Sequence, residues 1–530
     1  MLSNQRAGST PVPGNRPPEF SGGFFFGEKM TPHVYPRQCA FKSIEDIKGK
    51  KVTIMGLGLN GGGEAAVRFF LNKGAFVTVT DMKNEEQLKA TIDKLNSDDS
   101  LDHSHLTYHL GEHRLEDFKN ADCVIKNPGV KFEGNKYLAA ARAIETDLSI
   151  FLRFTNCPII AVTGSKGKSS TVSAIYYGLT QAGYTAFLGG NITVSPLTFF
   201  DQVNGDTPVV IEFSSWQLAD LRGRGVLRPH IAVITKIVPD HQNWYGNMED
   251  YVADKRLIYA DQTKGDYSIF DSGDDQPGTE PDESLHPGIK SWGDLFASES
   301  KATVLRYGKN ASWKLDLGEL LVPGQHMKTN AQNAALVMHL MGIPDSRIKE
   351  ILQKWPGIDH RLQYFHSWKN DKGCTIKFYN DSCATVPEAA AAASQAFGKP
   401  VILMTGGTDK GLELTPLIKT LTQPDDKTIP VKDLYLLAGT ATDKLLPELD
   451  KAGVKYHGPF DGLEALLMEA KDVLKRIDCR VTPDNDKNCE DGNDSTEIFV
   501  FSPGATSFGM FANEFDRGNK YMNEVKRIFK

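Results

Sequence analysis

The sequence predicts an α/β protein built from parallel sheets, and three observations lead to this prediction. Short apolar runs alternate with helix-like stretches from about residue 45 to the C-terminus, as in strands joined by crossover helices. Two of these strands, 51–55 and 160–163, lead into glycine-rich turns that are followed by helices. At 530 residues the chain has room for about three domains.

Composition indicates a globular, soluble protein. Hydrophobic residues make up 40% and charged residues 24%, and the net charge is −7 without a Lys/Arg-rich run, so neither a nucleic acid nor an anionic membrane surface is expected as a partner. No apolar run reaches the length of a membrane span, and the N-terminus lacks the apolar segment of a signal peptide. The seven scattered cysteines form no C-x-x-C pair, which favours a reducing, cytoplasmic location.

Residues 160–170 (IAVTGSKGKSS) predict a phosphate-binding loop between a strand and a helix. Gly164 and Gly167 let the backbone wrap around an anion, and the helix N-terminus presents N–H groups to it. Lys168 would lie at the β- and γ-phosphates, and the Ser169 hydroxyl would hold Mg²⁺. The two glycines are closer than in the common G-x-x-x-x-G pattern, so a glycine-rich turn without a ligand is the alternative.

A second glycine-rich turn, Gly56-x-Gly58-x-x-Gly61, follows the strand 51–55, and Asp81 lies twenty positions after Gly61. Alone, this pattern is typical of a dinucleotide-binding dehydrogenase. A nucleotide-sugar diphosphate satisfies it equally well, because a helix N-terminus binds a pyrophosphate and an acid at the next strand end meets a ribose or base. A tight turn without a ligand remains the third possibility.

Acidic and imidazole side chains follow two further buried-type strands. Glu212 and Ser214 end one strand, and Asp240 and His241 follow the next. In open α/β sheets, ligands gather at the carboxyl ends of the strands, and oxygen and imidazole groups beside a triphosphate suit Mg²⁺. Lys255 follows on a helix-like stretch. A structural histidine and a solvated lysine are the alternatives.

Strands at 375–379, 401–404 and 498–501 each end in a small-residue polar turn, which predicts a further doubly wound sheet with its own ligand edge. Two acidic stretches, 271–300 and 483–497, read as solvated surface insertions.

Together these motifs resemble the Mur ligase family, most of all its D-glutamate-adding branch, from about residue 45 to the C-terminus. Besides the two glycine-rich loops, the segments that carry the resemblance are Asn127-Pro128-Gly129, Gly190-Asn191-Ile192, Glu212-Phe213-Ser214-Ser215-Trp216-Gln217-Leu218, Asp240-His241, Lys255, His360-Arg361, Asn380-Asp381-Ser382 and Ser502-Pro503.

The resemblance implies three α/β domains after a poorly ordered extension at 1–42. These are a Rossmann-like UDP-binding domain at 43–145, a central ATP-binding ligase domain at 146–357, and a Rossmann-like C-terminal domain for the amino acid and ATP at 358–530. A cytoplasmic monomer is implied.

The implied reaction is an ATP-dependent ligation in peptidoglycan synthesis. The carboxylate of UDP-N-acetylmuramoyl-L-alanine attacks the γ-phosphate of ATP, and the amine of D-glutamate displaces phosphate from the resulting acyl phosphate. Lys168 and two Mg²⁺ ions would neutralise charge. Lys255 matches a family lysine that is carbamylated by CO₂, which requires a neutral amine and therefore a depressed pKa.

The resemblance also assigns roles. The catalytic and metal-binding positions are Lys168, Ser169, Glu212, His241 and Lys255. The ATP-binding positions are Gly164, Ser165, Lys166, Gly167, Lys168, Ser169, Ser170, Asn330, Arg361 and Asp381. The substrate-binding positions are Gly58, Leu59, Asn60, Asp81, Gly129, Asn191, Ser214 and Gln217, with Thr385, Lys410 and Ser507 for the glutamate.

Four positions depart from the family pattern. Lys236 stands where Asn is usual, Met327 replaces an Asn, Cys383 replaces a Lys near the amino-acid site, and Glu514 stands where an aromatic residue is usual. The match is therefore closer at the ATPase centre than at the amino-acid site. The alternatives are a sister ligase that uses L-glutamate or another acceptor, and a NAD-dependent dehydrogenase with an accessory ATPase. A folate ligase is disfavoured because it lacks a UDP domain.

Overall fold

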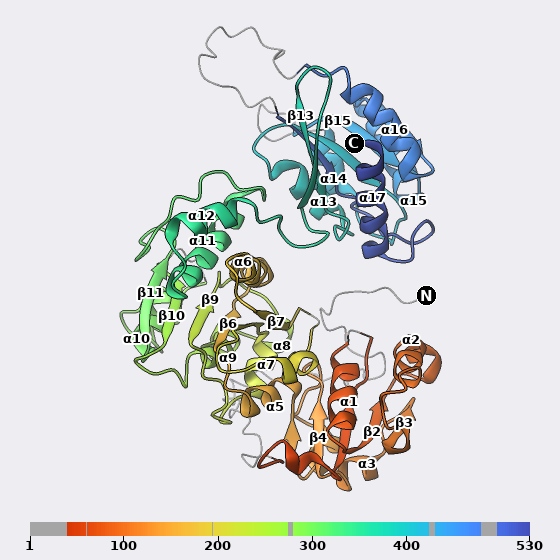
Figure 1. Ribbon diagram of the computed structural model, residues 1–530. Helices are drawn as coiled ribbons and strands as arrows, with labels where there is room; N and C mark the ends of the chain where they lie inside the picture. The colour runs from red at the N-terminus through yellow and green to blue at the C-terminus, as the bar shows by residue number, and fades with distance from the viewer. Residues whose placement is uncertain (1–39, 60, 193, 274–278, 423–429, 479–495) are drawn as a thin grey trace, which may run out of the picture. The chain divides into compact units, whose positions relative to one another are not determined.

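The computed structural model describes residues 40–59, 61–192, 194–273, 279–422, 430–478 and 496–530. They form three β-sheets with accompanying helices (Figure 1). The predicted fold class is confirmed. By their contacts the residues divide into two compact units. One unit (Met1–Leu315 with Gln332–Ile348) holds the first two sheets, and the other (Asp316–Ala331 with Lys349–Lys530) holds the third. The domain limits inferred from the sequence stay a prediction.

The first sheet is entirely parallel, and its strand order places β1 between β2 and β4. The strand order therefore reverses at β1, with β2 and β3 on one side and β4 and β5 on the other. Ligands of such sheets bind at this switch point. Its strands, in spatial order, are β3 (Leu106–Leu110), β2 (Phe76–Asp81), β1 (Lys51–Met55), β4 (Cys123–Lys126) and β5 (Ile144–Glu145). Its helices are η1 (Glu45–Ile47), α1 (Gly62–Asn72), α2 (Glu85–Asn96), η2 (His103–His105), α3 (Leu115–Lys119), α4 (Lys136–Ala140) and α5 (Asp147–Phe154).

The second sheet is also parallel, and its central strands β6, β8 and β9 are buried along their whole length. Helices on both faces of a parallel sheet explain why these strands read as continuous apolar runs. Its strands, in spatial order, are β11 (Thr303–Tyr307), β10 (Tyr267–Asp271), β9 (Ile231–Ile234), β6 (Ile159–Thr163), β8 (Val209–Glu212) and β7 (Phe187–Gly190).

The helices that accompany this second sheet include one that the sequence reading missed. They are α6 (Lys168–Gln181), η3 (Pro196–Gln202), α7 (Ser215–Asp220), α8 (Gln242–Tyr245), α9 (Met248–Lys255), η4 (Arg256–Ile258) and α10 (Trp292–Glu299). Two more helices, α11 (Gln325–Leu340) and α12 (Asp345–Gln353), follow. Helix α10 lies inside the stretch 271–300, for which the sequence predicts a solvated insertion. It packs instead, because Trp292 and Phe296 are buried.

The third sheet is parallel except for its edge strand β12, which pairs antiparallel with β13. Strand β12 escaped the sequence reading because its burial is mixed and it contains no continuous apolar run. The strands, in spatial order, are β12 (Gln363–Lys369), β13 (Thr375–Asn380), β17 (Thr496–Phe501), β14 (Val401–Gly406), β15 (Val431–Leu437) and β16 (His457–Phe460).

Helices cover both faces of this third sheet, as two separate hydrophobic clusters show. One face packs against α16 (Leu463–Leu474) and α17 (Glu514–Ile528). The other face packs against α13 (Pro387–Gln395), α14 (Thr415–Thr422) and α15 (Thr440–Ala452).

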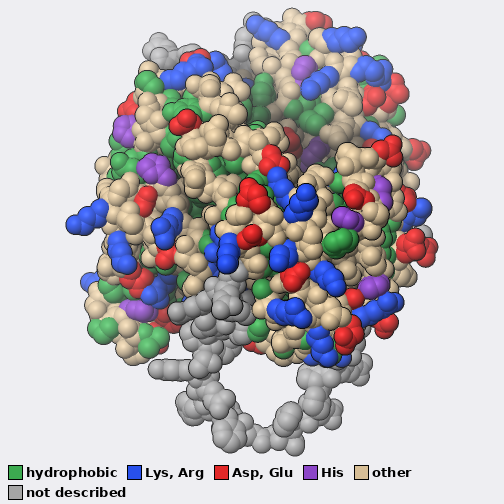
Figure 2. Space-filling view, turned by 60° about the horizontal axis from the view of Figure 1, so that its bottom comes forward, with side chains coloured by type: hydrophobic (Ala, Val, Ile, Leu, Met, Phe, Trp, Pro, Cys, Tyr) green, Lys and Arg blue, Asp and Glu red, His purple; other side chains and the backbone are tan. Residues whose placement is uncertain are grey.

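Some features bear on the environment of the chain. No helix in the described part of the chain is long and apolar enough to cross a membrane. Basic and acidic side chains are interspersed on the face that Figure 2 shows. Cys374 is disulfide-bonded, which departs from the expectation of reduced thiols. The second acidic insertion falls almost wholly outside the described residues, as does most of the N-terminal extension.

Candidate active site

The phosphate loop of the second sheet has the predicted strand–loop–helix form, and its shape requires glycine. Gly164 has a φ of 141°, and a Cβ atom there would lie 2.0 Å from Thr235 Oγ1. Gly167 adopts a left-handed conformation (φ 92°) and caps the N-terminus of α6. The backbone N–H of Ser165 donates to the Lys236 carbonyl oxygen at 2.9 Å, which anchors the loop to the neighbouring strand end. The loop therefore leaves the N-terminus of α6 available to an anion.

Two lysine side chains meet at this loop. The Nζ atoms of Lys168 and Lys255 each lie 2.9 Å from the carbonyl oxygen of Gly164, and Lys168 also donates to the Ser165 carbonyl oxygen at 3.0 Å. Lys255 is only 2% exposed, and its ammonium lies 4.5 Å from the centre of the Tyr251 ring. Burial, reinforced by the charge of Lys168, lowers the pKa of Lys255 well below its usual value.

Glu212, at the end of β8, supplies an oxygen that lacks a protein partner. Its side chain is 2% exposed, and its Oε1 accepts a hydrogen bond from Asn191 Nδ2 at 2.8 Å. Its Oε2 is buried and has no hydrogen-bond partner among the described residues. A buried carboxylate oxygen without a partner is costly unless a cation or donor meets it. The arrangement is therefore suited to hold a cation.

His241 is the N-cap residue of α8 and adopts a left-handed conformation (φ 52°), and its backbone N–H donates to Asp240 Oδ1 at 3.0 Å. Burial lowers the pKa of the imidazole, and the positive charges of Lys255 and Lys168 lower it further, while Asp240 opposes this shift. The neutral imidazole that results has a nitrogen lone pair free for a metal ion.

These side chains could hold Mg²⁺ only by combining different ligand types: a carboxylate, an imidazole, a hydroxyl and a modified lysine. No group of three or more His, Cys, Asp or Glu side chains that could hold a metal ion occurs in the part of the chain that the structure describes. The predicted ligands include just one carboxylate and one imidazole, together with Ser169 and Lys255. The unpartnered oxygen of Glu212 fits a cation, whereas Lys255 fits only if its charge is reversed.

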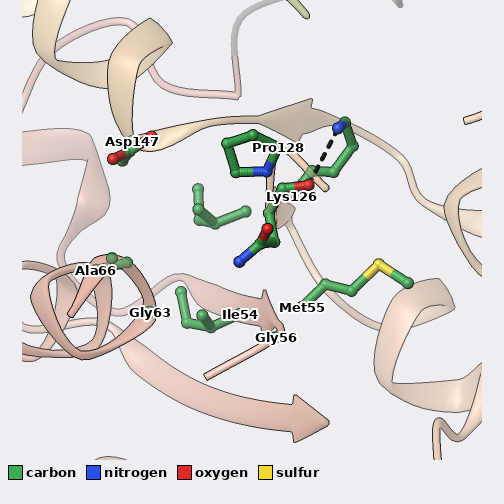
Figure 3. Close-up of a pocket in the computed structure, with 11 residues that line it drawn as sticks. Ile54, Met55, Gly56, Gly63, Ala66, Lys126, Pro128 and Asp147 are labelled. Carbon is green, nitrogen blue, oxygen red and sulfur yellow. Dashed lines mark hydrogen bonds between the residues drawn. The ribbon is translucent and has the colours of Figure 1, made fainter. Parts of the chain in front are cut away.

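A small pocket lies at the switch point of the first sheet (Figure 3). It is lined by the ends of β1 and β4, the N-terminus of α1 and Asp147. Gly63 is required there, because a Cβ atom would lie 2.2 Å from the Leu57 carbonyl oxygen. The second predicted phosphate site thus has a cavity beside a helix N-terminus.

The predicted substrate residues near this pocket are partly engaged in the fold. The Oδ2 of Asp81 accepts a hydrogen bond from the backbone N–H of Gly58 at 3.1 Å, so this acid shapes the glycine-rich turn. Leu59 is 40% exposed in the same turn, and Asn60 lies outside the described residues. Gly129 follows β4, and its N–H donates to Asn127 Oδ1 at 3.0 Å.

Ser214 and Gln217 form a capping box at the start of α7. The Ser214 N–H donates to Gln217 Oε1 at 2.9 Å, and the Gln217 N–H donates to Ser214 Oγ at 3.2 Å. Their side chains therefore cap backbone N–H groups at the N-terminus of α7.

In the second unit, the structure brings together two of the three residues predicted to bind glutamate. The Nζ of the exposed Lys410 donates to Thr385 Oγ1 at 3.4 Å. Ser507 is buried in the turn after β17, and that turn meets the turn after β14 where the Thr506 N–H donates to the Thr408 carbonyl oxygen at 3.0 Å.

Of the predicted ATP-binding residues of this unit, Asp381 has the most perturbed environment. It accepts hydrogen bonds from Ser502 Oγ at 2.7 Å and from the Leu362 N–H at 3.1 Å. Burial nevertheless raises the pKa of its carboxyl group to about 7. Asn330 is buried on α11, and Arg361 is half-buried.

Comparisons with known proteins match the parts of the chain that contain the pocket and the phosphate loop. The family profile described as Mur ligase MurD-like, N-terminal domain, covers residues 50–148, and the Mur ligase middle domain covers 162–338. A UDP-N-acetylmuramoylalanine--D-glutamate ligase of Treponema pallidum is 39% identical over 91% of this chain and 98% of its own length. Relatives of the same name from Borreliella burgdorferi and Roseiflexus are 35% and 32% identical over 92% and 91% of this chain and 99% of their own lengths.

This chain is a Mur ligase. A solved structure of UDP-N-acetylmuramate-alanine ligase from Thermotoga maritima is 16% identical, covers 90% of this Mur ligase and 99% of its own chain, and has a TM-score of 0.47. Membership of the family rests on the sequence relatives.

Sequence reading did not single out three charged residues that lie at the pocket or near the predicted amino-acid site of this Mur ligase. Lys126 and Asp147 line the pocket. Arg517 is 0% exposed, and it donates to the Ser382 carbonyl oxygen at 2.8 Å and to the Ala505 carbonyl oxygen at 3.1 Å. The available signal for Lys126 was a charged residue at the end of an apolar strand, since it is the last residue of β4 (CVIK).

Two of the residues that depart from the family pattern, Glu514 and Cys383, lie close to the buried Arg517. Burial lowers the pKa of Arg517 to about 10, while nearby Glu514 and Cys383 act in the opposite direction. The Lys236 departure matters less to the phosphate loop, because its contact there is made by its backbone carbonyl oxygen. Nothing in the structure explains Met327.

Proposed function

We propose that this Mur ligase joins D-glutamate to UDP-N-acetylmuramoyl-L-alanine with hydrolysis of ATP, in peptidoglycan synthesis. The names of relatives that are 30–39% identical over more than nine-tenths of the chain support this activity. The structural observation that carries the proposal is the meeting of Lys168, Lys255 and the unpartnered oxygen of Glu212 around one phosphate loop.

The first step needs positioning and charge neutralisation rather than covalent help from the protein. The carboxylate of the UDP-linked substrate attacks the γ-phosphorus of ATP, and ADP leaves. The N-terminus of α6 and Lys168 would hold the phosphates, with Ser165, Lys166 and Ser170 in the same loop. Magnesium, when bound, would neutralise phosphate charge.

Two Mg²⁺ ions would be held by Ser169, Glu212, His241 and a carbamate on Lys255. The neutral amine of Lys255 attacks the carbon of CO₂ and releases a proton, which leaves an anionic carbamate. This converts a neutral amine beside Lys168 into an anion, and it adds a second anionic oxygen ligand to the carboxylate of Glu212. The lowered pKa of Lys255 supports this modification.

The second step joins the amino acid. The amine of glutamate attacks the acyl carbon, and phosphate leaves through a tetrahedral intermediate. Lys410, Thr385 and Ser507 would hold the carboxylates of glutamate, since these groups need cationic or N–H and O–H partners away from water. Asn330, Arg361 and Asp381 would hold ATP. The enzyme would act as a monomer in the cytoplasm.

One assay tests the proposal directly. Phosphate release from ATP is measured with UDP-N-acetylmuramoyl-L-alanine and with D-glutamate or L-glutamate in separate reactions, and the product is identified by mass spectrometry. Release that requires both the UDP-linked substrate and D-glutamate is expected. A preference for L-glutamate would make the protein a sister ligase, and no release with either amino acid would refute the proposal.

A further inference from the structure

The segment 126–131 starts at the last residue of β4 and is here called the β4 loop. Two of its lysines tie it to helices α7 and α8 of the second sheet. Lys126 comes first, and its side chain is 2% exposed. Its Nζ lies 3.1 Å from the Asn127 carbonyl oxygen, 2.9 Å from the Val130 carbonyl oxygen and 2.8 Å from Asp220 Oδ2 (Figure 3 draws the first of these bonds). Lys126 thus donates hydrogen bonds to two carbonyl oxygens of its own segment and forms an ion pair with Asp220. Asp220, 6% exposed, is the last residue of α7.

Lys131 makes the second tie. Its Nζ lies 3.8 Å from the centre of the Trp244 ring on α8, which is within the range of a cation–π contact. Trp244 packs against Trp216 of α7 with ring centres 4.6 Å apart, and Trp216 packs against His241 at 5.1 Å. A continuous row of side chains therefore runs from the β4 loop to the imidazole at the phosphate site.

The β4 loop also borders the pocket of the first sheet. Lys126, Asn127 and Pro128 line that pocket, and Gly129 follows them. A ligand in the pocket therefore contacts the same short segment that is held on α7 and α8. A second buried ion pair, Arg224 with Glu145 at 2.8 Å, also joins the two sheets, so removing one lysine should not separate them.

We propose that Lys126 and Lys131 are positioning residues for the UDP-linked substrate. They fix the β4 loop against α7 and α8, and through Trp244 and Trp216 they align the bound substrate with His241. This inference rests on the proposed ligase function. A merely structural role would lower stability without a selective effect on the UDP-linked substrate.

The first test compares Lys131→Met with Lys136→Met. Lys136 is a matched control, because its Nζ lies 5.0 Å from the centre of the neighbouring Tyr137 ring, a contact that stays within the first sheet's own helices. We expect Lys131→Met to raise the KM for UDP-N-acetylmuramoyl-L-alanine by about two- to fivefold, the range of an exposed cation–π contact. The KM for ATP should stay unchanged in both variants, and Lys136→Met should behave as wild type.

A binding measurement without ATP or Mg²⁺ complements the kinetics. Addition of UDP-N-acetylmuramoyl-L-alanine should change the tryptophan fluorescence of the wild-type enzyme, and Trp244→Phe should remove most of this change. Lys131→Met should reduce it at saturating substrate. An undiminished change in Lys131→Met would contradict the proposed row of contacts.

Lys126 needs a paired variant, because Lys126→Met alone would leave the buried Asp220 carboxylate without its ammonium. In Lys126→Met/Asp220→Asn both charges are removed. We expect its KM for the UDP-linked substrate to rise by about tenfold with the KM for ATP unchanged. Unchanged substrate KM values in Lys131→Met and in this folded double variant would overturn the inference, as would equal effects on both substrates. Absence of wild-type turnover would instead refute the proposed function, and this inference with it.

Discussion

The ammonium groups of Lys168 and Lys255 donate to one acceptor, the carbonyl oxygen of Gly164, at the same distance of 2.9 Å. Two cations that share an acceptor in a buried site repel each other, so one of them is held in its charged form only at a cost. The pKa of each is lowered, and that of Lys255 is lowered further because it is the more deeply buried. The difference in pKa fits the two proposed roles: Lys168 holds the phosphates as a cation, and Lys255 reacts with CO₂ as a neutral amine.

Replacing Lys168 should abolish phosphate release. In Lys168→Ala the charge that acts on the transferring phosphoryl oxygens is lost, while the glycine-determined loop shape remains. Phosphate release is measured with all substrates present, and thermal denaturation checks the fold. Lys89→Ala, which removes an exposed lysine that pairs with Asp93, is the control. Turnover of Lys168→Ala within about threefold of wild type would refute the phosphate-loop assignment.

Carbamylation predicts that Lys255→Ala is nearly inactive and is partly rescued by added short-chain carboxylic acids. Such acids would supply the oxygen ligands that the carbamate provides. Incubation of the wild-type enzyme with isotopically labelled bicarbonate, followed by carbon NMR, should show one carbamate signal that Lys255→Ala lacks. Full activity of the wild type in a CO₂-free preparation would count against the modification.

Asp381 should make the stability of the second unit depend on pH. Burial raises the pKa of its carboxyl group in the folded state to about 7, whereas an unfolded aspartate titrates near 3.9. The protonated carboxyl group of Asp381 costs the folded state nothing below the unfolded pKa. As the pH rises from there to the folded pKa, the unfolded state ionises first, and the free energy of unfolding falls. Relative to wild type, Asp381→Asn should therefore gain stability between about pH 4 and pH 7, by up to about 4 kcal/mol.

Urea denaturation of both proteins across this pH window measures the effect. Asp461→Asn, which changes an exposed aspartate of the same unit, serves as the matched control. A difference between Asp381→Asn and wild type that does not vary with pH would show that the carboxyl group of Asp381 titrates in its usual range.

Glutamate recognition should depend on Lys410. Lys410→Ala should raise the KM for D-glutamate by at least about tenfold and leave the KM for ATP nearly unchanged, because a lost charge-assisted hydrogen bond is worth about 1.5–3 kcal/mol. Lys444→Ala is the control, since Lys444 is an exposed neighbour that pairs with Asp409. If the KM values for ATP and glutamate change equally, the amino-acid pocket lies elsewhere.

The sequence was most informative where backbone geometry dictates residue type. The buried strand β6, followed by Gly164 and Gly167, could be read directly because only glycine tolerates those conformations. The edge strand β12 could not, since its apolar and polar residues follow no buried-strand pattern.

Contacts between distant segments were also beyond sequence reading. Nothing in the sequence pairs Lys126 with Asp220 or places Trp216 between Trp244 and His241. The resemblance implies a substrate-binding role for Ser214, and only the structure shows that its side chain caps α7.

The buried Glu212 oxygen, which lacks a hydrogen-bond partner among the described residues, lowers the stability of the folded protein. Occupants that satisfy this oxygen bind the folded state alone, so they shift the folding equilibrium by mass action. In a cell short of magnesium, more of the protein would open and be removed by proteases. The supply of this cation would then set how much of the enzyme persists, in addition to how fast each molecule works.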